Sequence, residues 1–485
     1  MKKIFLFLVN LVTVFLFCFS LYAQSPDRTK PPMLPPPQQL KLPNIQQFNL
    51  SNGLKVVLME KHEVPLIQLN VIIKTGVVND PENKSGLASF TMEMIDEGTA
   101  GKSSLEIADL IDYLGAKITT STGVHYSGVH MHTPLTKFDD ALKILQDIVL
   151  KPDFPKTELE RKKKERLTSI IQSHDQPTAI ASYAFNQFLF GKVYPYGKSL
   201  IGNESSIKAT TVEDLIDFHK KYFVANNAFI VAIGDINKEE LKKKLEYIFG
   251  SWKEGKVEEI NIKTPAQVDR RIVYLIDKPG APQSVINIGR IGAARLTGDY
   301  NSIVVMNTLL GGSFGSRLNQ NLREEHGYTY GAFSRFNFRI FPGSFIASSS
   351  VQTDVTDKAL FEFFKELNGI REPLSNADLN RAKNYVALNY PSEFQSVGEI
   401  AGHLEEMVEY NLPDNYFNEY ISQMLAVTGN EVTAAANKYI IPDQMIVVIV
   451  GDKAKIEDGI KALNLGEIRN LSIDEVIGKV PTLEN

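Results

Sequence analysis

The chain repeats itself at an offset of 217 residues, and this repeat restricts the fold more than any other feature. Four pairs of identical residues share the offset: Lys61 with Lys278, Pro65 with Pro282, Gly234 with Gly451, and Asp235 with Asp452. The pairs fall at both ends of the repeated unit, so they hold one register along its whole length. A period this long indicates two duplicated domains rather than a solenoid.

Helix-start signals keep the same register. Thr211 and Asp214 in the first copy correspond to Thr428 and Glu431 in the second, and each pair has the spacing of a capping box. We therefore expect a helix to begin at the same place in both copies.

Each copy has the pattern of an α+β unit. In the first copy, β-branched and apolar runs predict an opening pair of strands and a short closing strand. The predicted strands are 56–59, 66–74 and 229–233. Capping signals and apolar spacing predict helices over 85–96, 103–114 and 157–173, where Ser103 and Glu106 form a capping box and Gly115 ends the second helix.

Composition shifts predict the domain limits. Residues 251–270 are polar, charged and poor in apolar side chains, so we place a linker there, between domains at 49–250 and 271–470. Residues 24–48 are rich in proline and should form an extended tether, or a strap over a neighbouring surface. Residues 471–485 are expected to be a C-terminal tail.

The first 23 residues have the layout of a signal peptide: two lysines, an apolar run from Ile4 to Phe19, and Ala23 before Gln24. We expect cleavage after Ala23, export to the periplasm of a Gram-negative bacterium and no stable membrane insertion afterwards. The alternative is an uncleaved anchor. The single cysteine, Cys18, lies in this segment, so the mature chain has no thiol or cysteine ligand.

The charge balance argues against nucleic-acid binding. The formal net charge is −5, and the sequence offers no basic surface for a phosphate backbone.

The segment GLASFTMEMIDEGT, residues 86–99, resembles the zinc helix of the insulinase/pitrilysin family of metallopeptidases. In that family an H-x-x-E-H helix supplies two zinc-binding histidines and the glutamate that activates water. Here these three positions are Ser89, Met92 and Glu93. Neither a serine hydroxyl nor a thioether replaces an imidazole as a zinc ligand.

The family's third zinc ligand is a glutamate on a later helix. The resemblance places Thr168 and Ser169 at that position, and the nearest acid, Glu165, lies one turn too early. We therefore expect this chain to bind no zinc by itself. Two other pairs have weak metal-ligand spacing: His130 with His132 on one strand face, and His403 with Glu406 on a helix. For the histidine pair we favour solvation or hydrogen bonding, because no third ligand lies nearby in the sequence.

The second copy contains LGGSFGSRLNQNLREEHGYTYGAF, residues 310–333, which resembles the family segment whose arginine and tyrosine assist the zinc site. Those residues are Arg323 and Tyr330, seven positions apart as in the family. The alternative is that Arg323 only pairs with Glu324 and that Tyr330 is half-buried on a strand. Gly311, Gly312 and Gly315 precede this helix and are candidates for contact with substrate or for a tight turn.

The resemblance implies two homologous insulinase-like α/β sandwich domains that form half of a clamshell. A partner subunit that carries zinc would then complete a chamber for peptides or small unfolded proteins, and this chain would supply Arg323 and Tyr330 in trans. The rival hypothesis is a catalytically inert pseudoenzyme that acts as a peptide-binding or assembly scaffold. A third hypothesis, an active homodimer with an unrecognised metal site, has no ligand constellation in its favour.

Overall fold

The computed structural model describes residues 35–483. Residues 35–38 belong to a separate unit of the chain, Met1–Gln38, and have neither helix nor strand, so the fold described below concerns Gln39 onward. The predicted signal peptide and Cys18 lie outside the described residues.

The first copy of the repeat contains a six-stranded sheet with the order β1-β2-β8-β3-β7-β6. Its strands are β1 Ile45–Asn49, β2 Lys55–Glu60, β3 Leu66–Ile73, β6 Lys117–Thr122, β7 Ser127–Pro134 and β8 Ala228–Gly234. Strands β2 and β8 run parallel, and the other neighbours run antiparallel. A small hairpin, β4 Gly98–Thr99 with β5 Lys102–Ser103, lies outside this sheet.

The second copy has a six-stranded sheet with the order β11-β12-β10-β13-β9-β14. Its strands are β9 Ile272–Asp277, β10 Gln283–Ile291, β11 Thr329–Phe336, β12 Ser344–Gln352, β13 Ile446–Gly451 and β14 Glu467–Leu471. The two sheets have the same order once strands are matched by the repeat, except at one edge. There β1 runs antiparallel to β2, whereas β14 runs parallel to β9. The predicted fold class, two homologous domains of helices packed on sheets, is confirmed.

Helices follow the same order in both copies. In the first copy they are α2 Leu87–Met94, α3 Ser104–Tyr113, α4 Phe138–Leu150, α5 Lys156–Ser173, α6 Pro177–Phe190, α7 Glu204–Ala209, α8 Val212–Tyr222 and α9 Lys238–Phe249. In the second copy they are α10 Tyr300–Leu310, α11 Arg317–Asn319, a π-helical turn Gln320–Glu325, α12 Thr356–Gly369, α13 Asn376–Asn389, α14 Val397–Glu409, α15 Tyr416–Ala426, α16 Gly429–Tyr439, α17 Lys453–Ala462 and α18 Ile473–Ile477. The capping boxes predicted at Thr211, Thr428 and Ser103 are present. None of the helices in the described part of the chain has the length and apolar character needed to cross a membrane.

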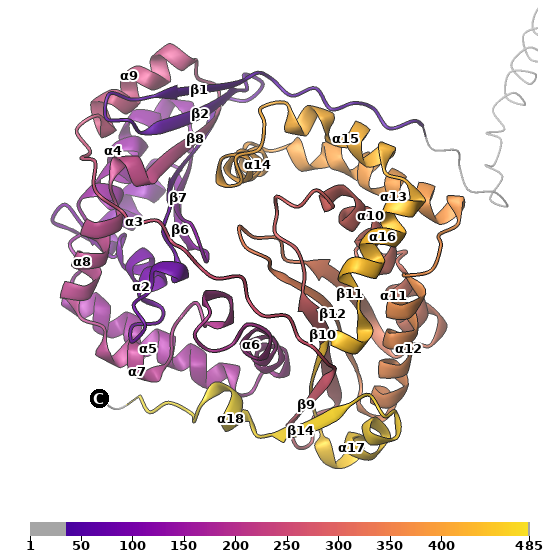
Figure 1. Cartoon of the computed structure of the whole chain (residues 1–485). Helices are drawn as coiled ribbons and strands as arrows, with labels where there is room; N and C mark the ends of the chain where they lie inside the picture. The colour runs from indigo at the N-terminus through magenta and orange to yellow at the C-terminus, as the bar shows by residue number, and fades with distance from the viewer. Residues whose placement is uncertain (1–34, 484–485) are drawn as a thin grey trace, which may run out of the picture. The chain divides into compact units, whose positions relative to one another are not determined.

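The two copies exchange one helix each (Figure 1). Helix α6 of the first copy packs against β13 and β10 of the second sheet, and α14 of the second copy packs against β8 and β3 of the first sheet. Side chains alternate along a strand, so each sheet presents two faces. On the first sheet, Val56 and Leu58 face its own helices, whereas Val57 and Met59 join the core of the second copy. The exchange therefore buries both faces of each sheet.

Residues 39–44 form a strap that connects the two copies before β1 begins. Leu40 and Leu42 pack against the core of the second copy, and the backbone N–H of Leu42 donates to Asn418 Oδ1 on α15 at 3.1 Å. In Figure 1 this segment runs from α15 to the edge strand β1 of the first sheet. At the other end of the chain, α18 packs on α6 and buries Val476.

Candidate functional site

Helix α2, which carries the zinc-site positions of the resemblance, is held at its N-terminus by a buried carboxyl group. Asp80 accepts from the backbone N–H groups of Gly86 at 2.6 Å and Ala88 at 2.8 Å. Burial raises the pKa of Asp80 to about 6. Gly86 has a φ of 87°, and a Cβ at this position would lie 2.6 Å from the backbone nitrogen of Gly202. The glycine therefore lets the loop 199–202 approach the start of α2 closely.

A buried arginine from α5 occupies the space beside α2. The Arg166 side chain is 3% exposed, and its Nε donates to Glu93 Oε2 at 2.9 Å. Its Nη2 donates to Ser89 Oγ at 2.9 Å, and its Nη1 donates to two backbone carbonyls at 3.1 Å. These carbonyls belong to Gly86 and Ile201. The guanidinium also lies over the ring of Phe90, 4.1 Å from its centroid.

These residues do not fit a zinc ion. Ser89 donates to the carbonyl of Leu200 at 2.5 Å and already accepts from Arg166, while Glu93 is paired with the same guanidinium. Met92 is buried in the apolar core of the first copy. Ser169 is exposed and donates to the carbonyl of Glu165 at 3.0 Å, away from Ser89 and Glu93. A zinc site needs side chains with free electron pairs, whereas this position holds the positively charged guanidinium of Arg166.

Elsewhere in residues 35–483, no group of three or more His, Asp or Glu side chains has the geometry of a metal site. Of the two weak pairs, His403 and Glu406 come together, with Nδ1 4.0 Å from Oε2, and His130 and His403 each have a further partner. His130 Nε2 lies 2.7 Å from Ser121 Oγ, and His403 Nε2 lies 3.4 Å from Glu393 Oε2.

The two residues predicted to assist a zinc site, Arg323 and Tyr330, lie at the surface of the second copy. Tyr330, on the edge strand β11, is 91% exposed, and within the described residues its hydroxyl has no hydrogen-bond partner. It is therefore not the half-buried tyrosine of the alternative interpretation. Arg323 pairs with Glu324, as the alternative interpretation expects, with Nε 3.3 Å from Oε1, and its guanidinium lies 4.7 Å from the ring centroid of Phe314. Among the described contacts, no hydrogen bond, ion pair or ring contact connects either residue to Ser89, Met92 or Glu93.

The three glycines before Arg323 differ in their surroundings. A Cβ on Gly311 would lie 2.2 Å from the backbone nitrogen of Ser334, and one on Gly312 would lie 2.8 Å from Asn307 Nδ2. Gly315 faces open space. Gly311 therefore permits close packing against β11, while Gly315 leaves room beside the π-helical turn.

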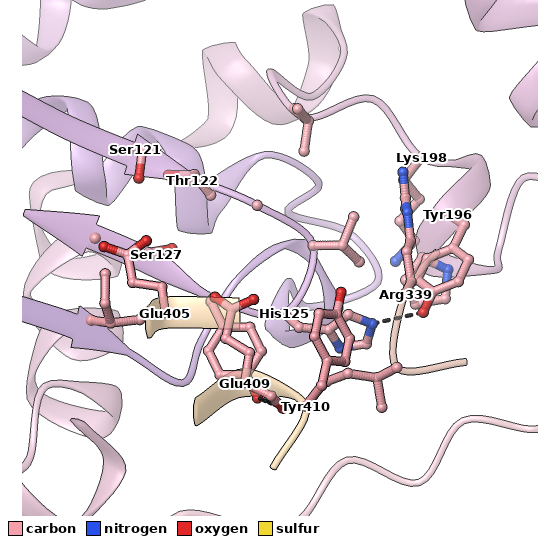
Figure 2. Close-up of a pocket in the computed structure, with 18 of the residues that line it drawn as sticks. Ser121, Thr122, His125, Ser127, Tyr196, Lys198, Arg339, Glu405, Glu409 and Tyr410 are labelled. Carbon is pink, nitrogen blue, oxygen red and sulfur yellow. Dashed lines mark hydrogen bonds between the residues drawn. The ribbon is translucent and has the colours of Figure 1, made fainter. Parts of the chain in front are cut away.

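A cavity of about 560 Å³ lies between the first sheet and the end of α14. Its lining comes from β6, β7 and the loop between them, from the turn Pro195–Gly197, from residues 339–340 and from α14. Figure 2 shows the carboxyl groups of Glu405 and Glu409 on one side of this cavity and Lys198 and Arg339 on the other.

Two carboxyl groups of α14, those of Glu405 and Glu409, are largely buried where they line the cavity. Glu405 accepts a hydrogen bond from the Asn70 side chain and lies 3.6 Å from His130 Nδ1. Burial raises the pKa of Glu405 to about 7, and burial together with the neighbouring Glu405 and Glu406 raises that of Glu409 to about 8. Both carboxyl groups therefore titrate near neutral pH.

The opposite side of the cavity is built around an aromatic ring. His125 Nε2 lies 2.8 Å from the hydroxyl of Tyr196, and the guanidinium of Arg339 lies 4.4 Å from the Tyr196 ring centroid. Burial lowers the pKa of His125 to about 4, so this histidine is neutral at physiological pH.

The sequence analysis missed Arg166, Glu405 and Glu409. Arg166 lies one turn before Ser169 on α5, so its spacing from the third-ligand position was a usable signal. Glu405 and Glu409 are four residues apart on one helix face, but nothing in the sequence shows that this face packs on the other copy's sheet.

Two family models match the chain. Residues 55–194 match the model described as insulinase (peptidase family M16), and residues 209–386 match the model described as peptidase M16 inactive domain.

Curated relatives and solved structures agree with these matches. The non-peptidase homolog YmxG of Helicobacter pylori (strain ATCC 700392 / 26695) is 22% identical over 411 residues, which cover 82% of this chain and 92% of the relative. The zinc protease PqqE of the same strain is 23% identical over 426 residues, covering 85% and 94%. The crystal structure of a peptidase M16 inactive domain from Pseudomonas fluorescens has a TM-score of 0.79 and 27% identity, covering 84% of this chain and 98% of that one.

Proposed function

Because the chain belongs to the insulinase family, peptidase family M16, we propose that it is the non-zinc subunit of an exported heterodimeric peptidase. It supplies Arg323, Tyr330 and half of the peptide chamber, and a homologous partner supplies the zinc. Alone, it hydrolyses no peptide.

The observation that carries this proposal is the contrast between the two candidate sites. At the zinc-site positions, the buried Arg166 donates one hydrogen bond to Ser89 and one to Glu93 from inside the fold. Arg323 and Tyr330, in contrast, lie at the surface, with the tyrosine hydroxyl free among the described residues. A fixed cation and a neutral hydroxyl donor suit the negative charge that develops on a peptide carbonyl oxygen during hydrolysis. Surface exposure lets them act on a peptide held by another subunit.

The sheet edges support an extended peptide as substrate. Strands β6 and β11 are edge strands at equivalent positions in the two sheets, and β11 carries Tyr330. A peptide that pairs with an exposed edge gains main-chain hydrogen bonds with little dependence on sequence. The glycine segment before Arg323 has open space at Gly315 beside the same region.

The relatives support the division of labour. One Helicobacter pylori strain contains both a chain named as a non-peptidase homolog and a chain named as a zinc protease, and both resemble this protein over more than four fifths of its length. These are the two kinds of chain that the proposed heterodimer requires.

The test mixes this chain with a zinc-bearing partner copurified from the native envelope and measures cleavage of an unfolded peptide. Arg323→Ala and Tyr330→Phe should each lower the rate at least tenfold, in line with the loss of an oxyanion donor. Arg381→Ala on α13 and Tyr113→Phe on α3 serve as exposed controls outside the proposed peptide-binding edge and should leave the rate unchanged. Equal rates for all four variants would remove the assisting role.

A second candidate function is a catalytically inert scaffold that binds peptides or organises an assembly. The cavity beside α14 favours this alternative, because it brings ionisable groups of both signs together without a zinc site. Copurification separates the candidates: the heterodimer predicts a stoichiometric zinc-bearing companion, whereas the scaffold predicts that the accompanying proteins lack zinc and peptidase activity.

A further inference from the structure

We propose that Arg166 is a built-in cation that takes the place of the family's metal: its guanidinium joins α2, α5 and the loop 199–202, and it excludes a metal ion even when ligands are restored. This inference depends on family membership and on the geometry around Arg166. It holds whether or not the chain works in a heterodimer.

The position of the guanidinium is defined by the helix that carries the lost ligands. Ser89 and Glu93 are four residues apart on α2 and therefore share one face. In the family this face holds the two zinc-binding imidazoles. Here Arg166 donates to both side chains, each at 2.9 Å, so the guanidinium bridges the two positions that a metal would bridge.

The contacts of Arg166 resemble a completed coordination shell. Four of its hydrogen bonds go to four different residues on α2 or on the loop before α7: Ser89, Glu93, Gly86 and Ile201. Arginine has five N–H donors in a rigid planar fork, so nearly all of its donor capacity is used inside the protein. One face of the plane is covered by Phe90.

The positive charge of Arg166 is balanced by a carboxylate beside it. Burial of Arg166 would be costly without a counter-charge, and Glu93 provides one at hydrogen-bond distance. Burial lowers the pKa of Arg166, and Glu93 opposes this effect. The buried carboxyl group of Asp80 lies close enough to act on Arg166 in the same direction as Glu93. A divalent metal placed beside the guanidinium would be repelled by it.

The position of Arg166 on α5 explains how one residue excludes the metal. The family's third ligand position, Ser169, lies on the same helix one turn later. A side chain that reaches from this helix to α2 occupies the gap that a metal would span between them. Restored ligands at positions 89, 93 and 169 would still meet a buried positive charge.

Metal content tests the exclusion. The triple variant Ser89→His, Glu93→His, Ser169→Glu should contain less than about a tenth of a zinc per chain after incubation with zinc and desalting. Adding Arg166→Ala to the same triple should raise the content at least fivefold, because three protein ligands make a zinc site once the cation is gone. Equal zinc content in the two proteins, whether high or absent, would overturn the exclusion.

Chemical rescue tests the structural role without any designed zinc site. Arg166→Ala should melt well below the wild type, and millimolar ethylguanidinium should recover at least half of the lost melting temperature. Ethylammonium, which has the charge but not the planar fork, should recover much less. No recovery, or equal recovery with both ions, would overturn the role. If Arg166→Ala does not fold, Arg166→Gln gives the same comparison.

Discussion

The two copies of the repeat differ most where the family resemblance places catalysis. The offset of 217 residues puts Ser89, Met92 and Glu93 opposite Met306, Leu309 and Leu310, all of which are buried in the apolar core of the second copy. Arg166 falls opposite Lys383, whose Nζ donates to the carbonyl of Val427 at 2.8 Å. The same fold therefore forms in the second copy with apolar side chains on α10, the helix that corresponds to α2. The polar cluster of the first copy is not a requirement of the fold, and it is best understood as an altered site.

The exchanged helices differ in a similar way. Helix α6 places Ile180, Ala184 and other apolar side chains against the second sheet. Helix α14 instead places Glu405 and Glu409 beside the first sheet, where they line a cavity. In both comparisons, one helix (α2 or α14) places polar or ionisable side chains inward where the corresponding helix of the other copy (α10 or α6) places apolar ones.

The largest expected effect comes from removing the buried cation. Arg166→Leu removes four hydrogen bonds and leaves the Ile201 carbonyl without the guanidinium donor, so the free energy of unfolding should fall by about 3 kcal/mol. That loss corresponds to a drop in melting temperature on the order of 10 °C. The equivalent change in the other copy, Lys383→Leu, removes one hydrogen bond and should cost about 1 kcal/mol. Denaturant unfolding of both variants measures the difference, and equal losses would contradict the comparison.

The pH dependence of stability should report on α14. The folded-state pKa values of Glu405 and Glu409, about 7 and about 8, lie above the value of about 4.3 for an unfolded glutamate. Between these values the folded state holds protons that the unfolded state has released, so stability falls as pH rises. Between pH 6.5 and 8.5 we expect a loss of about 2 kcal/mol.

In this pH window the carboxyl groups titrate and the nearby histidines do not. Burial lowers the pKa of His130, which faces Glu405, and of His125, so both are neutral above pH 6.5. Glu406, the other α14 carboxylate that acts on Glu409, is paired with Arg295 at 2.7 Å, and Lys198 and Arg339 lie on the opposite side of the cavity. The double variant Glu405→Gln, Glu409→Gln should flatten the profile, whereas Glu372→Gln, at an exposed position, should not. If the free energy of unfolding of the wild type does not change with pH over this window, Glu405 and Glu409 do not titrate there.

Much of the fold was predictable because it depends on local patterns. The strands at 56–59, 66–74 and 229–233 and the three helices all formed within a few residues of their predicted limits, since alternation and capping are local properties. Arg166 could not be identified as buried, because it follows the charged run Arg161–Glu165 and its burial depends on α2. The burial of Glu405 and Glu409 could not be predicted either, because their helix face is covered only when α14 packs on the sheet of the other copy.

A sharper comparison replaces the whole cluster rather than one member. In the variant Ser89→Met, Glu93→Leu, Arg166→Leu, the first two changes give α2 the apolar side chains that the second copy has on α10, and the third removes the cation that pairs with Glu93. A buried ion pair replaced as a unit by apolar side chains is often neutral in stability, so this variant should lie within about 1 kcal/mol of the wild type. It should thus recover most of what Arg166→Leu alone loses. If the triple variant is as unstable as the single one, the two copies do not share interchangeable packing at this position.

The smallest effect on stability is expected at the surface of the second copy. Tyr330 and its counterpart at the same offset, Tyr113, are 91% and 79% exposed, so Tyr330→Phe and Tyr113→Phe should each change the free energy of unfolding by less than about 0.5 kcal/mol. A function in peptide hydrolysis predicts that only Tyr330→Phe slows cleavage by the reconstituted complex. A substitution that slows cleavage without changing the free energy of unfolding shows that the side chain acts in the reaction rather than in the fold. If Tyr330→Phe destabilised the chain by 2 kcal/mol or more, the tyrosine would be a structural residue, and the asymmetry between the copies would reduce to the cluster around Arg166.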